Sequence, residues 1–387
     1  MKRWLKRLGA LLVLAVAVLL AAGPQLVQAH LNQTLPRPPY AASAAARALH
    51  GRLLIADMHC DALLWGNDLL ARGARGHVDV PRLVDGNVAL EGFAVVTKTP
   101  LGLNYERNDG NRLDNVTLLG LIQRWPPRTW TSLLERALYQ AGRLSAMAEC
   151  SEGRLTLIRT ADDLGRYLER RAKEPRITAG FLAIEGAHAL DGEVANVDRL
   201  FDAGYRMMAP THFFDNDLGG SAHGVLKGGL TDKGRAMIRR MDALGMVLDL
   251  AHASPQTFDD AIAIATRPVV VSHTGVRATC DNLRNLSDDQ LRAVAKNGGV
   301  VGIGFWDTAT CGQDAAAIAR AIRHAVEVAG LEHVGLGSDF DGAIEAPFDA
   351  SGLVEVTDAL LAEGFGEDEI AGIMGGNVVR VMSHVLP

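Results

Sequence analysis

Histidines and carboxylates that could bind a metal stand at the ends of apolar runs in this chain. The first run, "IADMHCD" (residues 55–61), places His59 and Asp61 two residues apart. Because alternate side chains of a β-strand share a face, both would point to the same side, where they could bind one ion. Taken alone, the pair is equally compatible with a solvated histidine at a surface turn, so the later runs must decide.

The same pattern recurs along the chain. The residues that close these runs are His59, Asp61, Glu185, His212, His252, His273, Asp339 and Asp341. Imidazole nitrogens and carboxylate oxygens suit Zn²⁺ and related divalent ions, and the lack of cysteine at these positions argues against a closed structural zinc site. Three of these histidines and two of these carboxylates would already provide enough ligands for two ions, with Glu185 as the bridging carboxylate. Such a site would polarise a carbonyl group and hold a hydroxide at neutral pH, which favours hydrolysis.

Eight apolar runs must position these residues. They cover residues 53–61, 91–99, 179–188, 205–212, 246–252, 268–273, 300–305 and 333–342. Amphipathic stretches such as 231–245 and 287–298 separate most of them. Alternating strands and helices predict an α/β fold, a (β/α)8 TIM-type barrel, whose strand C-termini meet at one rim. A doubly wound open sheet is the rival architecture, but no glycine-rich nucleotide fingerprint follows the first run.

A long helical insertion after the second strand interrupts this alternation of strands and helices. It extends from Pro100 to about Lys173 and contains a Pro126–Pro127 turn. An insertion on a strand-to-helix connection would lie over the catalytic end of a barrel as a lid. A peripheral helical pair is an equal alternative.

The N-terminus has a different character. Lys2, Arg3, Lys6 and Arg7 precede an uncharged apolar stretch, which indicates that residues 1–29 form a signal peptide or an N-terminal membrane anchor. Either would place the rest of the chain outside the cytoplasm, in the periplasm or anchored to the inner membrane facing the periplasm. A proline-rich linker, residues 30–45, then leads to the barrel domain, residues 46–387. Cleavage of the leader stays open.

The overall composition narrows the partners. The chain has 387 residues, of which 48% are hydrophobic and 22% charged, as expected for a globular protein with a sizeable core. Its formal net charge of −6 gives no reason to expect a nucleic-acid partner, and a small-molecule substrate fits better. The four cysteines, Cys60, Cys150, Cys280 and Cys311, could pair but are too few for a disulfide framework. We expect them to be structural.

Seven motifs together resemble the membrane dipeptidase (renal dipeptidase) family, peptidase family M19, among the amidohydrolase-like metal-dependent hydrolases. They are "DMHCD", "IEGAH", "PTHFFDN", "DLAH", "VVVSH", "LRNLSD" and "GLGSDFDG", and the similarity covers nearly the whole chain after Leu53. The resemblance implies a zinc-dependent dipeptidase that holds two zinc ions. In this scheme His59 and Asp61 bind one ion, His252 and His273 bind the other, and Glu185 bridges both.

The resemblance also implies three further roles. His212 would contact the substrate carbonyl and support the oxyanion, and Arg284 would bind the C-terminal carboxylate of the substrate. Asp339 would transfer a proton from the nucleophilic water to the leaving amine. The expected reaction is attack of a metal-bridging hydroxide on the peptide bond of a dipeptide, and dipeptides with a C-terminal D-residue are included among the candidates.

Residues near these ligands receive lesser roles. Asp57 is expected to support the metal ligands and Asp341 to stabilise its own loop. His188 could contact the substrate or serve as a hydrogen-bond donor to a ligand. His77 and His223, which lie outside strand ends, are expected to be structural.

Two other functions stay open at this stage. The same barrel and metals could hydrolyse another small carboxylate-bearing amide, a β-lactam or a lactone. A metal-binding envelope protein with decayed catalysis is the non-enzymatic alternative, although the complete ligand set and the intact Asp339 count against it. The sequence is also compatible with a homodimer and with membrane attachment through the N-terminus.

Overall fold

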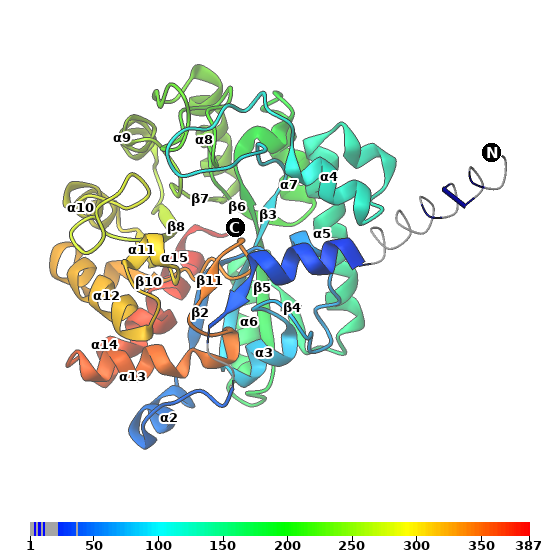
Figure 1. Cartoon of the computed structure of the whole chain (residues 1–387). Helices are drawn as coiled ribbons and strands as arrows, with labels where there is room; N and C mark the ends of the chain where they lie inside the picture. Colours follow the sequence, from blue (N-terminus) through cyan, green and yellow to red (C-terminus); the bar gives the residue numbers. More distant parts are fainter. Residues whose placement is uncertain (1–3, 5–6, 9–10, 12–21, 36–37) are drawn as a thin grey trace.

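The computed structural model describes residues 4, 7–8, 11, 22–35 and 38–387, and parallel strands form its centre (Figure 1). The strands are β2 (Ile55–Cys60), β3 (Val88–Val96), β4 (Leu155–Leu157), β5 (Thr178–Glu185), β6 (Tyr205–Met208), β7 (Val247–Leu248), β8 (Val270–Thr274), β9 (Val300–Ile303) and β10 (Val334–Leu336). Their order across the sheet is β7-β6-β5-β3-β2-β10-β9-β8, with β4 beside β5. A parallel bridge from Asp249 to Val270 joins the two ends of this order. The predicted (β/α)8 TIM-type barrel is confirmed.

Each of the eight predicted apolar runs overlaps one strand of the barrel. Every residue of β2, β3 and β5 is buried, because one face of each strand points into the barrel and the other packs under helices. Met58 packs in an apolar cluster with Val378 and Val381 of the last helix. His59, the next residue, faces the rim where the strands end.

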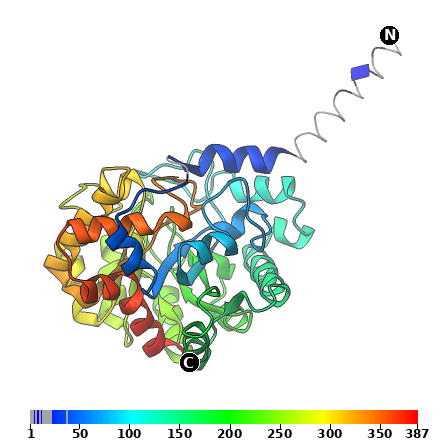
Figure 2. The same ribbon diagram turned by 90° about the horizontal axis from the view of Figure 1, so that it is seen from below.

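Helices surround the barrel (Figures 1 and 2). They are α2 (Ala44–His50), α3 (Val80–Asp85), α4 (Asn115–Ile122), α5 (Leu133–Cys150), α6 (Ala161–Arg171), α7 (Asn196–Asp202), α8 (Asp232–Leu244), α9 (Pro255–Ile264), α10 (Asp288–Asn297), α11 (Asp307–Thr310), α12 (Ala315–Ala329), α13 (Val354–Ala362), α14 (Glu367–Ala371) and α15 (Asn377–Val385). Side chains that accept backbone N–H bonds begin the predicted amphipathic helices, as Thr231 does for α8 and Ser287 for α10.

The insertion after β3 combines both predicted arrangements. Helix α4 lines the cavity at the rim, whereas α5 packs against β4 and α7 on the outside of the barrel. The insertion is mostly helical, as predicted, but it also contains β4. A strand of three residues is too short to give a periodic signal in the sequence.

The chain before α2 also contacts the barrel. Residues 22–31 are helical, and β1 (Gln33–Thr34) pairs in parallel with β11 (Glu345–Ala346). Much of the predicted leader, residues 1–29, lies outside the described residues. Within the described ranges, no helix is both long and apolar enough to cross a membrane.

His50 joins three elements of the outer layer. Its Nε2 donates to the carbonyl oxygen of Gly86, 3.0 Å away, so its Nδ1 is free to accept from Thr357 Oγ1 of α13 at 2.8 Å. Burial lowers the pKa of His50 to about 4. The folded protein therefore holds this imidazole in its neutral form.

Acid should destabilise the protein through His50. The unfolded state binds the proton first, so the contribution is complete above pH 6.5 and is lost toward pH 4, about 3 kcal/mol in total. Gln can make both hydrogen bonds without ionising, so His50→Gln should lose less stability than the wild type between pH 7 and pH 4.5. Urea unfolding at each pH measures this, and an equal loss in both proteins would contradict it.

Candidate active site

The predicted metal ligands surround Glu185 at the rim of the barrel. The Nε2 atoms of His252, His273 and His59 lie 3.0, 3.3 and 3.6 Å from Glu185 Oε1. Asp61 Oδ2 lies 3.8 Å from His59 Nε2. All five side chains are buried. Residues that are distant in the sequence therefore converge because β2, β5, β7 and β8 end at the same rim.

The geometry of these donor atoms fits divalent metal ions. His59 Nε2 and Asp61 Oδ1 are buried and have no hydrogen-bond partner within residues 22–35 and 38–387. The Nε2 atoms of His252 and His273 lie 3.0 Å apart, close to the roughly 3.3 Å expected when two nitrogens bind one tetrahedral ion at about 2.0–2.1 Å. Three groups of donor atoms lie close enough to hold an ion: His59, Asp61 and Glu185; Glu185, His212 and His252; and His59, His273 and Asp339.

A buried serine orients two of the imidazoles. Ser272 Oγ donates to Asp249 Oδ2 at 2.6 Å and lies 2.9 Å from His273 Nδ1 and 3.3 Å from His59 Nδ1. Because the single hydroxyl proton goes to the carboxylate, the oxygen accepts from both imidazoles. Both rings then carry their proton on Nδ1. Their Nε2 lone pairs are left facing Glu185, as metal ligands require.

Burial and charge set the protonation of the site. Burial lowers the pKa of His212, His252 and His273 well below its usual value, so these rings are neutral. Burial acts the same way on His59, but the carboxylates of Glu185, Asp61 and Asp339 outweigh it and raise the pKa of His59 to about 10. The carboxylates therefore stabilise a positive charge at this position, which a metal ion would supply in place of the proton.

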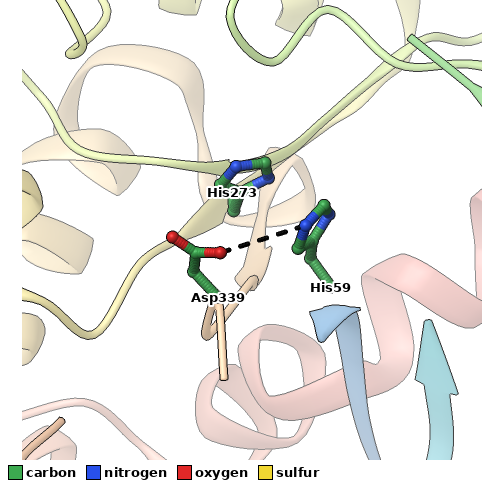
Figure 3. Close-up of side chains that lie close together, drawn as sticks. All are labelled: His59, His273 and Asp339. Carbon is green, nitrogen blue, oxygen red and sulfur yellow. Dashed lines mark ion pairs between the residues drawn. The ribbon is translucent and has the colours of Figure 1, made fainter. Parts of the chain in front are cut away.

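His212 and Asp339 flank the ligand cluster. His212 Nε2 lies 3.4 Å from Glu185 Oε2. Asp339 Oδ1 lies 4.0 Å from His59 Nε2, beside the ring of His273 (Figure 3). Burial raises the pKa of Asp339 to about 8. His252 and Asp339 have φ angles of 60° and 61°, in the left-handed region that non-glycine residues rarely adopt. These turns allow the chain to leave β7 and β10 sharply while both side chains point into the cavity.

Arg284 lies on the same cavity. Its Nη2 donates to the carbonyl oxygen of His273 at 2.6 Å, and its guanidinium lies 5.4 Å from the centre of the Trp306 ring. In the described part of the chain, the buried Nε has no partner. A fixed guanidinium with an unused donor suits a carboxylate ligand.

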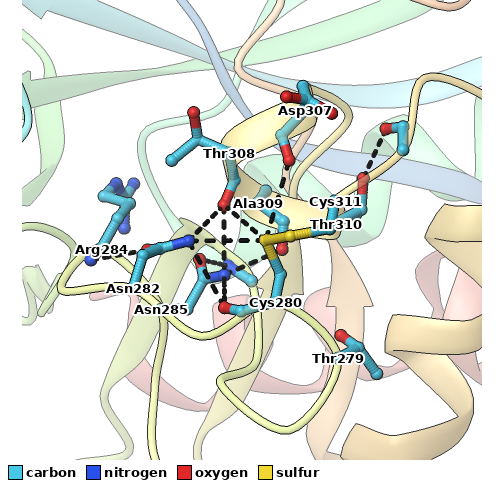
Figure 4. Close-up of a disulfide and its surroundings, with 12 residues drawn as sticks. Thr279, Cys280, Asn282, Arg284, Asn285, Asp307, Thr308, Ala309, Thr310 and Cys311 are labelled. Carbon is cyan, nitrogen blue, oxygen red and sulfur yellow. Dashed lines mark hydrogen bonds between the residues drawn. A yellow bond between two sulfur atoms is a disulfide. The ribbon is translucent and has the colours of Figure 1, made fainter.

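A disulfide holds the loop that carries Arg284. Cys280 and Cys311 are bonded, and Asn282 and Asn285 donate to the carbonyl oxygen of Thr308 at 2.8 and 3.2 Å (Figure 4). Asn282 Oδ1 in turn accepts from the backbone N–H of Arg284 at 2.9 Å. The loop after β8 is thereby fixed to α11.

The cavity above these residues has a volume of about 510 Å³, within the range of small-molecule sites. Asp61, Glu185, His212, His252, Arg284 and Asp339 form its polar part. Apolar side chains from α4, from the loop around Tyr105, from residues 22–31 and from the barrel itself, among them Trp65 and Phe213, form most of the rest. The site is thus polar where the metal ligands converge and apolar elsewhere.

The residues with lesser predicted roles lie at the edge of the site. Asp57 Oδ1 accepts from the backbone N–H of Ser338 at 2.8 Å, and Asp341 accepts from the N–H groups of His77 and Val78. His77 thus belongs to the loop structure, as expected. The ring of His223 packs on Phe213, with centroids 4.8 Å apart. His188 packs at the same distance on Phe214, and burial lowers its pKa to about 3.

Sequence reasoning missed several residues that support the site. Ser272 and Asp249 form the network beneath the imidazoles, and Asp249 could have been noticed as a carboxylate inside the apolar run "MVLDLAH". Trp65 Nε1 donates to the carbonyl oxygen of Asp341 at 2.7 Å. Val27 and Leu31, in the predicted leader and linker, line the cavity. No local pattern marks these last two residues.

Comparisons with known proteins agree with this geometry. The family model "Membrane dipeptidase (Peptidase family M19)" matches residues 43–386. The chain belongs to the membrane dipeptidase family. Dipeptidase tcpJ of Claviceps purpurea (strain 20.1) is 30% identical over 321 residues, which are 80% of this chain and 69% of the relative. As a member of family M19 the protein is a metal-dependent dipeptidase, so the non-enzymatic alternative is set aside.

Solved structures share the fold of this membrane dipeptidase family member. The probable dipeptidase PvdM from Pseudomonas aeruginosa superimposes with a TM-score of 0.73 at 19% identity, covering 88% of this chain and 98% of the other. A metallo peptidase from Rhodobacter sphaeroides, liganded with a phosphinate mimic of the dipeptide L-Ala-D-Ala, gives a TM-score of 0.69 at 24% identity, covering 86% and 99%.

Removal of the serine hydroxyl beneath the imidazoles should weaken metal binding. Ser272→Ala leaves the Nδ1–H groups of His59 and His273 without their acceptor, so metal affinity should fall about 10- to 100-fold. Competition with a chelating dye measures this directly. Ser151→Ala removes another buried serine hydroxyl far from the rim and should leave the affinity unchanged. Equal affinities for the two variants would contradict the orienting role of Ser272.

Loss of the disulfide should weaken substrate binding. The double variant Cys280→Ser, Cys311→Ser frees the loop of Arg284, so KM for a dipeptide should rise several-fold while kcat changes little. The bond closes a separation of 31 residues, so unfolding stability should fall by up to about 4 kcal/mol. Cys150→Ser, at an exposed free cysteine, is the matched control. An unchanged KM in the double variant would contradict this account.

Proposed function

We propose that this enzyme is an exported zinc dipeptidase that hydrolyses dipeptides, including those with a C-terminal D-residue, through two zinc ions bridged by Glu185. The observation that carries this proposal is the convergence of His59, Asp61, His252 and His273 on Glu185, beside the unused donor of Arg284. Nitrogen and oxygen ligands without cysteine are typical of catalytic zinc sites.

We assign the five proposed ligands to two ions, as the family resemblance implies. His59 and Asp61 would hold one ion, His252 and His273 the other, and Glu185 would contribute to both. When bound, the pair of ions would polarise the peptide carbonyl and provide a bridging hydroxide at neutral pH. The Nδ1–H bonds of His59 and His273 to Ser272 keep their Nε2 atoms directed at this position.

The remaining polar residues position the substrate and move its protons. Arg284 Nε would donate to the C-terminal carboxylate, which orients the peptide bond toward the ligand cluster. His212, whose ring is neutral at physiological pH, would donate to the carbonyl oxygen as negative charge develops there. Asp339 would take the proton of the attacking water and deliver it to the amine nitrogen as the C–N bond breaks.

Two observations support the finer parts of this proposal. The dipeptide mimic bound by the metallo peptidase from Rhodobacter sphaeroides ends in D-Ala, which supports acceptance of a C-terminal D-residue. The Cys280–Cys311 disulfide is of the kind that persists in oxidising compartments, which supports export to the periplasm. The proposal also includes attachment of the protein to the membrane through its N-terminus and its assembly into a homodimer.

A panel of L,L and L,D dipeptides tests the function. The zinc-loaded protein should cleave members of the panel, and Asp339→Asn should lower kcat about 10²- to 10⁴-fold while retaining its zinc. Arg284→Met should raise KM for dipeptides and spare ester or lactone substrates that lack a carboxylate. Zinc binding without cleavage of any dipeptide would contradict the proposal and favour a lactone or β-lactam as substrate.

A further inference from the structure

The substrate cavity has a wall that precedes the barrel in sequence. Val27 and Leu31, in the helical residues 22–31, line the same cavity as Glu185 and Asp339. Figure 2 shows this helix in blue along the upper edge of the molecule, outside the barrel. Val27 is 42% exposed and Leu31 is 39% exposed. Apolar surface of both side chains is therefore available to a molecule in the cavity.

Backbone pairing holds the chain that follows this helix against the connection after β10, which carries Asp339. Gln33 and Thr34 of β1 pair in register with Glu345 and Ala346 of β11. The N–H of Gln33 donates to the carbonyl oxygen of Ile344 at 3.2 Å. These bonds attach the segment a few residues beyond the proposed proton-transfer group.

Asn32 adds a side-chain bond to the same connection. Its Oδ1 accepts from the backbone N–H of Ala343 at 2.8 Å, and its side chain is buried. Ala343 itself lines the cavity. The position of Leu31 is therefore tied, through the next residue, to the cavity lining.

His77 links the segment to this connection from a third direction. Its Nε2 donates to the carbonyl oxygen of Gln33 at 3.1 Å, which leaves Nδ1 to accept from the backbone N–H of Asp341 at 3.0 Å. The ring is completely buried. The segment is thus built into the loop structure around Asp339.

We propose that the N-terminal segment, residues 27–35, is a specificity wall in which Val27 and Leu31 select dipeptides with a bulky apolar side chain. This inference rests on the proposed dipeptidase function. The polar part of the cavity receives the carboxylate and the peptide bond, so a substrate side chain must turn toward the apolar lining. Leu119 and Ile122 of α4 extend the apolar surface that such a side chain would meet.

Cleavage or retention of the predicted leader, residues 1–29, would change the composition of this wall. Cleavage after Ala29 would remove Val27 and leave Leu31 and Asn32 in place, whereas retention keeps both apolar residues. The retained and cleaved forms would therefore differ in the size of side chain that they favour, although the metal ligands are the same.

Kinetics of the full-length chain on Ala-Ala and Leu-Leu test the wall. Leu31→Ala removes apolar contact with a large side chain, so kcat/KM for Leu-Leu should fall about five- to tenfold. The value of kcat/KM for Ala-Ala should change less than about twofold. Leu26→Ala, at a neighbouring side chain that is 61% exposed, is the matched control and should leave both substrates unaffected.

A second pair of variants tests the attachment of the segment. Asn32→Ala removes the acceptor of the Ala343 N–H and should reproduce the selective loss on Leu-Leu. Asn32→Asp retains an acceptor and should preserve the wild-type preference. An equal change on both substrates, or no change in Leu31→Ala, would overturn the wall. Failure of the wild type to cleave either dipeptide would instead overturn the proposed function.

Discussion

Glu185 is a carboxylate buried among four imidazoles, and its charge is the constraint on which the arrangement at the rim depends. Its Oε1 lies within 3.6 Å of the Nε2 atoms of His59, His252 and His273. A buried charge is stable only when it is paired or bound to a metal. Burial and the nearby carboxylates of Asp61 and Asp339 raise the pKa of Glu185 well above its usual value. The neutral rings of His252 and His273 do not offset this, so the ionised form of Glu185 needs positive charge, which His59 or a metal ion would supply.

The barrel makes this concentration of ligands possible. Parallel strands buried on both faces give a rigid frame, and the strain of left-handed residues at the rim, such as His252 and Asp339, is offset by the packing beneath them. Beyond the ligands, the Asp249–Ser272 pair fixes the imidazole tautomers and the disulfide of Cys280 fixes the loop of Arg284. The chemistry is thus placed on strands, while α4 and the N-terminal segment shape the apolar walls.

The strands and the ligand set could be predicted because both follow local patterns. His59 lies near the end of β2 and Asp61 directly follows that strand, and each later histidine closes an apolar run. The supporting contacts could not be predicted, because Ser272 contacts His59 only after β2 and β8 come together in the fold. In the same way, the pairing of β1 with β11 joins distant parts of the chain. Four cysteines allow several pairings, so the Cys280–Cys311 bond also required the fold.

Anomalous X-ray diffraction at the zinc edge, from crystals of the zinc-loaded protein, would locate the metal ions. We expect two peaks about 3.5–4 Å apart, with Glu185 bound to both ions. His59 and Asp61 should contact one ion, and His252 and His273 the other. A single peak, or ions bound away from Glu185, would contradict the two-metal site on which the proposed reaction rests.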